Sequence, residues 1–303
     1  MKINICKENL FRNLQHTYAS QKYVLHSMNG YSDIGNRKRQ EDSLIIDTHP
    51  SNENICLMGI ADGMGGLKNG ALASNIALRL LTTWFENLPT ATLNNDIILS
   101  KYINRFLISA DELIRAICSE GGTTLAFSII REESTIYVNV GDSRIYSKAN
   151  SSLQQLSSDQ SLCWNLWKTG TITEKNAIYF HKKNNLITSR LGCIKRKLEI
   201  EKKIIDNSQF DSIYIFSDGI TDCLTDEQLR TIVNFPNCCA KTIVTSALEN
   251  TLTQNYLNNE DFYNEVKGGK DNATAVMYCK KRRAKDEIQT MAWISNRPIR
   301  NTI

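Results

Sequence analysis

Acidic residues stand at the ends of several segments whose composition is typical of β-strands. Six carboxylates share this placement: Glu41, Asp42, Asp62, Asp142, Asp218 and Asp271. One edge of an antiparallel sheet collects the ends of some strands and the starts of others, so these distant residues can converge. Gathering so many negative charges is unfavourable unless a cation neutralises them. The pattern therefore predicts a cation-binding site made of oxygen ligands.

The residue types narrow the choice of cation. No His or Cys stands in any of the acidic clusters. Hard, oxygen-preferring ions such as Mg²⁺ or Mn²⁺ suit these ligands better than zinc or copper does. Most of the acids also adjoin glycine, as in Asp62-Gly63, which lets a backbone carbonyl approach a ligand. One Asp at a strand end is ordinary turn chemistry, but the whole set favours a binding site.

The elements that must position these acids are short strands and amphipathic helices. β-Branched and aromatic residues bounded by turn formers predict strands at 43–47, 54–61, 123–131, 135–140, 144–147, 212–216 and 272–279. Helical periodicity predicts helices around 72–85, 95–119, 160–168, 225–233 and 240–257. Short turns between successive strands suit antiparallel pairing. We expect an α+β fold, because a doubly wound nucleotide-binding fold would need strict strand-helix alternation.

Six short motifs occur in a fixed order along the chain. They are GNRKRQED (35–42), ADGMGG (61–66), GGTT (121–124), GDSR (141–144), SDGITD (217–222) and GKDNAT (269–274). Each motif alone is weak, but their order and spacing together resemble the protein phosphatase 2C family over about residues 27–280. Motifs between residues 159 and 192 are similar to the bacterial members in particular.

The resemblance implies both a fold and an activity. The fold would be an αββα sandwich, in which two central antiparallel sheets are flanked by helices. The activity would be that of a metal-dependent serine/threonine phosphoprotein phosphatase, in which a water bridged between two Mn²⁺ or Mg²⁺ ions attacks the phosphorus. Its substrates would be phosphoproteins made by a bacterial serine/threonine kinase. The alternative is a catalytically inactive, phosphatase-like binding or regulatory protein, although none of the mapped carboxylates is missing.

The family's metal ligands can be carried over onto matching residues. Asp62 would bridge the two ions. Glu41 and the carbonyl of Gly63 would hold one ion, and Asp218 and Asp271 the other.

Further roles follow from the same resemblance. Asp142 with Asp218 would serve a third, weaker ion. Asp42 would orient water from behind the ligands, with Asn272 as a second supporting residue. Arg37 would grip the phosphate oxygens with its planar fork. The expected catalytic residues are therefore Arg37, Asp62 and Asp218.

Residues 161–185 would form a flap near this site. Trp164 and Trp167 within it either contact a protein substrate or pack as core residues of a short helix, because aromatics three apart share a helical face. His181 is interpreted as structural. Gln160 stands where relatives often carry His, and we expect it to affect substrate handling or local packing.

Composition excludes several other classes of protein. The chain has 303 residues, of which 41% are hydrophobic and 22% charged, as in ordinary globular proteins. It has no apolar run long enough for a membrane span and no signal-peptide core, so we expect a cytoplasmic protein. The nine cysteines are scattered and never form C-x-x-C, which favours reduced thiols over disulfides or a zinc site.

The net charge of +4 is unevenly distributed, because both ends are basic and the middle is acidic. The basic run at 280–283 could touch nucleic acid, but no aromatic-basic motif accompanies it, so we expect no nucleic-acid partner. We divide the chain into an N-terminal extension (1–26), a catalytic domain (27–280) and a basic C-terminal tail (281–303), and we expect a monomer.

Overall fold

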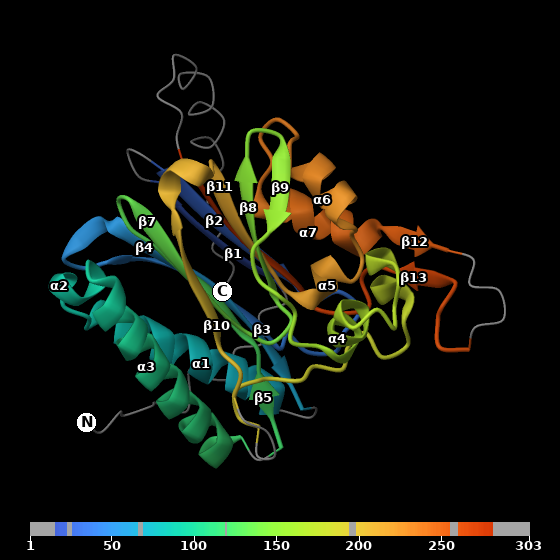
Figure 1. Ribbon diagram of the computed structural model, residues 1–303, viewed down its shortest axis with the longest axis horizontal. Helices are drawn as coiled ribbons and strands as arrows, with labels where there is room; N and C mark the ends of the chain where they lie inside the picture. The colour runs from blue at the N-terminus through green and yellow to red at the C-terminus, as the bar shows by residue number, and fades with distance from the viewer. Residues whose placement is uncertain are drawn as a thin grey trace, which may run out of the picture.

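The computed structural model describes residues 16–22, 26–65, 69–118, 120–193, 198–254 and 260–280. Residues 1–15, Gly66 of the second motif and the basic tail 281–303 lie outside the described residues. Two antiparallel sheets occupy the centre of the fold (Figure 1).

The first sheet has the strand order β1-β2-β14-β11-β8-β9. These strands are β1 (His16–Lys22), β2 (His26–Asp33), β14 (Ala273–Lys280), β11 (Ser212–Phe216), β8 (Arg144–Ala149) and β9 (Ser152–Gln155). The second sheet has the order β10-β7-β6-β4-β3, with β5 beside β4. Its strands are β10 (Glu201–Asp206), β7 (Ser134–Val140), β6 (Leu125–Ile130), β4 (Asn52–Met64), β3 (Asp42–His49) and β5 (Gly122–Thr123). All seven strands predicted from the sequence are present.

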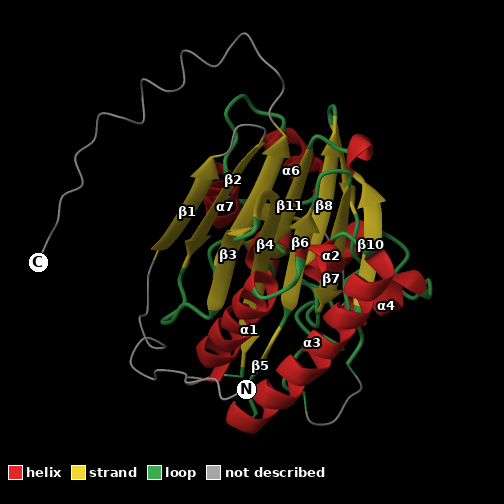
Figure 2. Cartoon of the chain, turned by 90° about the vertical axis from the view of Figure 1, so that its left-hand side faces the viewer, coloured by secondary structure: helices red, strands yellow, loops and turns green. Residues whose placement is uncertain are grey.

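Two helical layers enclose the sheets. The sheets pack face to face over buried residues such as Met28, Met58, Ile60 and Val276. The helices α1 (Asn69–Glu86), α2 (Thr90–Leu93) and α3 (Asp96–Ile117) cover the outer face of the second sheet. The helices α5 (Asp218–Thr221), α6 (Asp226–Val233) and α7 (Ala240–Glu249) cover the first. Figure 2 shows α1 and α3 on one side of the strands and α6 and α7 on the other. This arrangement confirms the predicted αββα sandwich.

The helices next to the second sheet form on the predicted pattern. The side-chain oxygen of Asn95 caps α3 by accepting a hydrogen bond from the backbone N of Ile98 at 3.0 Å. Trp84 of α1 stacks on Phe106 of α3, with ring centroids 4.8 Å apart. The apolar stripes of the two helices therefore pack on each other as well as on the sheet.

One predicted helix is too long. The sequence predicted a helix over 240–257, but α7 ends at Glu249, and β12 (Thr251–Thr253) pairs with β13 (Glu265–Lys267). Asn250 takes extended backbone angles, and its Nδ2 donates a hydrogen bond to Cys223 O at 2.5 Å. This tertiary contact ends the helix, and the β-branched threonines that follow suit a strand.

Several strands were not predicted. In β2, Gly30 lies where a Cβ would meet side chains of Val276, Ile46 and Leu44 at 3.0–3.3 Å, so this strand of the first sheet packs closely against β3 of the second although its sequence signal is weak. β1 lies within the proposed N-terminal extension and pairs with β2 over seven residues.

No described helix has the length and apolar character that a membrane span requires. The eight cysteines within the described residues are free thiols.

Candidate active site

A cavity of about 480 Å³ opens where the strand ends of the two sheets meet. Its lining comprises Arg37, Lys38, Arg39, Glu41, Asp62, Gly63, Met64, Gly65, Asp142, Asn185, Ile187, Asp218, Asp271 and Asn272. The structure thus brings all of the expected metal ligands and Arg37 into one place. Asp42 does not line the cavity and lies behind it.

The ends of β3 and β4 place Glu41 beside Gly63. Gly63 N donates a hydrogen bond to Glu41 O at 3.1 Å. A Cβ on Gly63 would lie 2.2 Å from Gly70 O and 2.8 Å from Glu41 O, so no larger residue fits here. The glycine therefore lets the start of α1 pack directly against the strand end that carries Asp62.

Asn272 fixes the loop that carries Arg37 and Glu41. Its Oδ1 accepts a hydrogen bond from Glu41 N at 2.8 Å, and its Nδ2 donates to Ile34 O at 2.9 Å and to Arg39 O at 3.0 Å. The start of β14 and the loop between β2 and β3 are thereby held together. Asn272 therefore supports the loop that carries Arg37 and Glu41.

Asp42 holds two hydroxyl groups from other segments. Its Oδ2 accepts hydrogen bonds from Ser217 Oγ at 2.8 Å and from Thr274 Oγ1 at 2.6 Å. Ser217 precedes Asp218, and Ser217 Oγ also accepts from Thr274 N at 2.9 Å. Asp42 therefore positions the strand ends that carry Asp218 and Asp271.

The cavity carboxylates raise one another's pKa values. Burial is the largest cause for Asp62, Asp142 and Asp218, and repulsion from neighbouring carboxylates adds to it. The pKa of Asp218 rises to about 6, by burial first and by the charge of Asp271 second. The pKa of Glu41 is also raised by burial, although Arg37 opposes the shift. Such mutual repulsion is what a bound cation would relieve.

The donor set fits divalent cations. Its ligands are all oxygen atoms, and Asp218 Oδ1 is buried without a hydrogen-bond partner among the described residues. Within the described ranges, however, no three Asp, Glu, His or Cys side chains are placed to hold one ion in this conformation. Instead Asp271 Oδ2 accepts from Arg37 Nη2 at 2.5 Å. Binding of an ion by Asp271 would therefore replace this pairing.

The turn that carries Asp142 is clamped by the segment before the flap. Gly141 N donates to Gln160 Oε1 at 2.8 Å, and Gln160 N donates to Gly141 O at 3.0 Å. These contacts give Gln160 a local packing role, one of the two roles expected for it. Two residues along, Arg144 Nε donates to Asp159 Oδ2 at 2.8 Å, and both side chains are almost fully buried.

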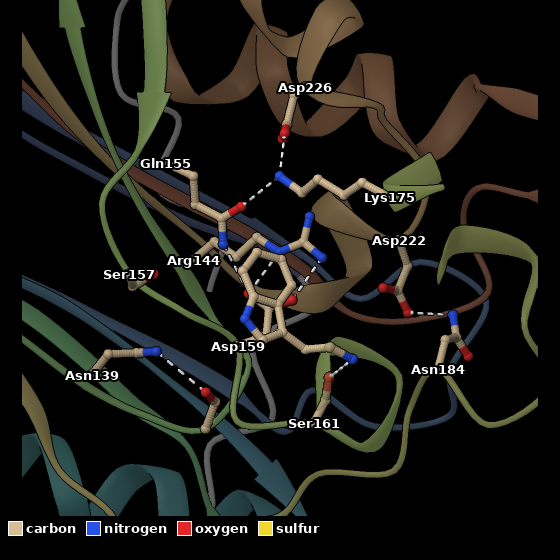
Figure 3. A network of polar contacts seen from close by, with 12 residues as sticks. Asn139, Arg144, Gln155, Ser157, Asp159, Ser161, Lys175, Asn184, Asp222 and Asp226 are labelled. Carbon is tan, nitrogen blue, oxygen red and sulfur yellow. Dashed lines mark hydrogen bonds and ion pairs between the residues drawn. The ribbon is translucent and has the colours of Figure 1, made fainter. Parts of the chain in front are cut away.

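Figure 3 shows how this ion pair extends into a wider network. Gln155 Nε2 donates to Asp159 Oδ1 at 2.9 Å, and Lys175 Nζ donates to Gln155 Oε1 at 3.1 Å. Lys175 Nζ also donates to Asp226 Oδ2 at 2.6 Å. The network joins β8, β9, the flap and α6.

The predicted flap contains α4 (Leu162–Lys168) and the 3₁₀-helix η2 (Lys175–Phe180). Asn185, at the end of the flap, and Ile187, just after it, line the cavity. Trp164 is 6% exposed and packs with Cys163 and Ile178, and Trp167 packs against the same cluster. Neither tryptophan lines the cavity, so the packing favours the core interpretation.

His181 lies apart from the cavity carboxylates. Its ring meets Phe262 edge-on, with centroids 5.0 Å apart, and its Nδ1 accepts from Lys183 N at 3.1 Å. This packing agrees with a structural role.

Sequence reasoning gave no role to Asp222. It lies at the end of α5, its Oδ2 accepts from Asn184 Nδ2 at 3.1 Å, and burial together with the charge of Asp218 raises its pKa. The spacing of four residues between Asp218 and Asp222 was the available signal, because residues four apart share a helical face.

The chain was compared with known protein families and proteins. A family model described as "Protein phosphatase 2C" matches residues 29–256. The serine/threonine phosphatase stp of Listeria monocytogenes (serotype 4b) is 31% identical over 205 residues, covering 65% of this chain and 78% of that protein. The protein phosphatase PhpP of Streptococcus pneumoniae is 28% identical over 211 residues, covering 67% of this chain and 82% of that protein.

Solved structures share the fold. Serine/threonine phosphatase Stp1 from Staphylococcus aureus superposes with a TM-score of 0.69 at 25% identity, covering 84% of this chain and 95% of that one. The catalytic domain of the serine/threonine protein phosphatase PstP, solved in complex with two manganese ions, gives a TM-score of 0.66 at 23% identity. The match covers 85% of this chain and 99% of that one.

Proposed function

The chain belongs to the protein phosphatase 2C family and is a protein serine/threonine phosphatase, and we propose that it uses two Mn²⁺ or Mg²⁺ ions to hydrolyse phosphoserine and phosphothreonine in proteins. The observation that carries this proposal is the convergence of Glu41, Asp62, Asp218 and Asp271 on one cavity, in which Asp218 Oδ1 is buried and unpaired among the described residues. Mutual repulsion of these acids supports a cation at this point.

The ligands divide between two positions. Asp62 would contribute to both, Glu41 and the Gly63 carbonyl would hold one ion, and Asp218 and Asp271 would hold the other. When bound, the ions supply Lewis acidity toward the phosphate and lower the pKa of water.

Two further carboxylates adjoin these positions. Asp142 lines the same cavity beside Asp218, and Asp222 lies on the other side of Asp218 in an adjoining pocket. We assign Asp142 with Asp218 to a third, weaker ion.

Arg37 binds the phosphate group. Its side chain is 55% exposed at the cavity and already held on one side, because Nε donates to Lys270 O at 3.1 Å and Nη2 to Asp271. Its Nη1 makes no hydrogen bond with a described residue, which leaves donors for phosphate oxygens. If Asp271 bound a metal ion instead, Arg37 Nη2 would also be free to donate. Arg37 and the ions would then bind the same phosphate.

The remaining assignments concern the whole chain. We assign residues 27–280 to the catalytic domain, to which β1 of the extension 1–26 adds an edge strand, and 281–303 to the basic C-terminal tail. The protein acts as a monomer in the cytoplasm, where free thiols persist, on substrates of a serine/threonine kinase.

Calorimetric titration of Mn²⁺ into metal-free protein tests the proposal. We expect at least two ions per chain with the unchanged sequence, and a loss of at least one of them in Asp218→Asn. Asp226→Asn, in a carboxylate that pairs with Lys175 and does not line the cavity, is the matched control and should bind as the unchanged chain does. Equal binding by all three proteins would refute the assignment.

A further inference from the structure

Two loops are tied together at one side of the cavity. Asn36 N donates to Gly269 O at 2.7 Å, Arg37 Nε donates to Lys270 O at 3.1 Å, and Asn272 Nδ2 donates to Arg39 O at 3.0 Å. The loop between β2 and β3 and the loop before β14 therefore form one rigid edge.

This edge is basic beyond Arg37. Lys38, Arg39 and Lys270, here called the basic rim, add three cations to it. Lys38 and Arg39 line the cavity, and Lys270 lines an adjoining pocket of about 230 Å³ that shares Asn185 with it. Cations brought together in this way repel one another, so they favour an anionic ligand.

The rim has little to neutralise it. The side chains of Lys38 and Lys270 are exposed and make no hydrogen bond or ion pair with any residue that the structure describes. Arg39 Nη1 is buried and has no hydrogen-bond partner among the described residues. Arg39 acts on the charge of Glu41, which is itself a proposed metal ligand.

The other walls differ from the rim. Met64, Asn185 and Ile187 are uncharged, and the acids of the cavity are buried or half-buried and face the ions. At the far end of the adjoining pocket, Lys267 is already paired with Glu265 at 3.0 Å. Among the residues that line the cavity, the cations therefore all stand on this one edge.

We propose that the basic rim selects phosphoproteins that carry acidic residues beside the phosphorylated serine or threonine. This inference rests on the proposed phosphatase function and names its preferred substrates. Phosphate and flanking carboxylates would bind together, the phosphate at Arg37 and the ions, the carboxylates at Lys38, Arg39 and Lys270. Such contacts between exposed charges act mainly on association and on choice of partner.

The test compares three phosphothreonine peptides that differ only in the two residues on each side, which are Glu, Ala or Lys. With Mn²⁺, kcat/KM should fall in the order Glu, Ala, Lys, with about a tenfold ratio between the Glu and Lys peptides, since each exposed contact contributes little. The ratio should shrink in high salt, because exposed charges are screened.

The double variant Lys38→Gln with Lys270→Gln should lower that ratio at least threefold. Lys101→Gln with Arg105→Gln, two exposed cations on α3, is the matched control and should leave the ratio unchanged. Equal kcat/KM for the three peptides, or an unchanged ratio in the rim variant, would overturn the inference while the phosphatase function stands.

Failure to hydrolyse even the Ala peptide would instead count against the proposed function. In that case, binding of the same three peptides, measured by fluorescence anisotropy, tests the role of the basic rim. Tighter binding of the Glu peptide, lost in the rim variant, supports the inference, and equal binding of all three overturns it.

Discussion

Asp42 and Asp62 are direct partners across the β3–β4 ladder, yet only Asp62 reaches the cavity. Opposed residues of an antiparallel pair point to the same face, so their charges act on each other, and Asp42 contributes to the raised pKa of Asp62 after burial and Asp218. Two hydroxyl groups stabilise Asp42, whereas no hydroxyl of a described residue donates to the Asp62 carboxylate, which is the group we propose a cation would neutralise.

Replacing Asp42 by Asn should weaken metal binding without removing a ligand. The amide cannot accept both the Ser217 and Thr274 hydroxyls in the same way, so the strand ends that carry Asp218 and Asp271 lose their support. We expect Mn²⁺ affinity to fall by about 10- to 100-fold in calorimetry. Asp47→Asn, on the same strand away from the cavity, should have no effect, and unchanged affinity in Asp42→Asn would show that the carboxylate has no such role.

The metal-free protein should lose stability as pH rises. The pKa of Asp218 in the folded chain is about 6, raised from 3.8 by burial and by Asp271, so its contribution is complete below the unfolded value and is lost as pH passes 6. Between about pH 3 and pH 7 the free energy of unfolding should fall by roughly 3 kcal/mol from this group.

Urea unfolding in EDTA measures this slope. Asp218→Asn should flatten it, because the amide does not titrate, and Mn²⁺ at neutral pH should restore stability. If the free energy of unfolding had the same pH dependence in both proteins, Asp218 would not be the source of that dependence.

Much of this site could be predicted because its acids stand at strand ends with glycine neighbours. Asp62 and Asp142 were placed by local pattern, and the sheet edge brings them together. The pairing of Asp271 with Arg37 and the hydroxyl donors of Asp42 could not be predicted, because they depend on side-chain orientation between segments far apart in sequence. The strand at 251–253 was missed for a similar reason, since its partner β13 follows a separate segment.

Breaking the Arg144–Asp159 pair should destabilise the fold strongly. Both side chains are at most 4% exposed, so Asp159→Asn leaves a buried guanidinium without its counter-charge. The free energy of unfolding should fall by about 3–5 kcal/mol in urea titration. Glu227→Gln, in the exposed pair with Arg230, should change it by less than about 0.5 kcal/mol. Comparable losses in the two variants would contradict the distinction.

Trp164→Ala should lower stability and spare substrate affinity. The ring is 6% exposed in the flap cluster, and its removal should cost about 3–5 kcal/mol of unfolding free energy. KM for a phosphothreonine peptide should stay unchanged at temperatures where the variant is folded. A raised KM with unchanged stability would favour substrate contact instead.

Hydrolysis of a phosphothreonine peptide tests the central claim most directly, with purified chain in Mn²⁺, in EDTA, and as Asp62→Asn in Mn²⁺. The account predicts phosphate release that requires Mn²⁺, stops in EDTA, and falls at least about 100-fold in Asp62→Asn, since this residue is proposed to hold both ions. Equal activity in EDTA, or in the variant, would contradict a metal-centred mechanism at this cavity.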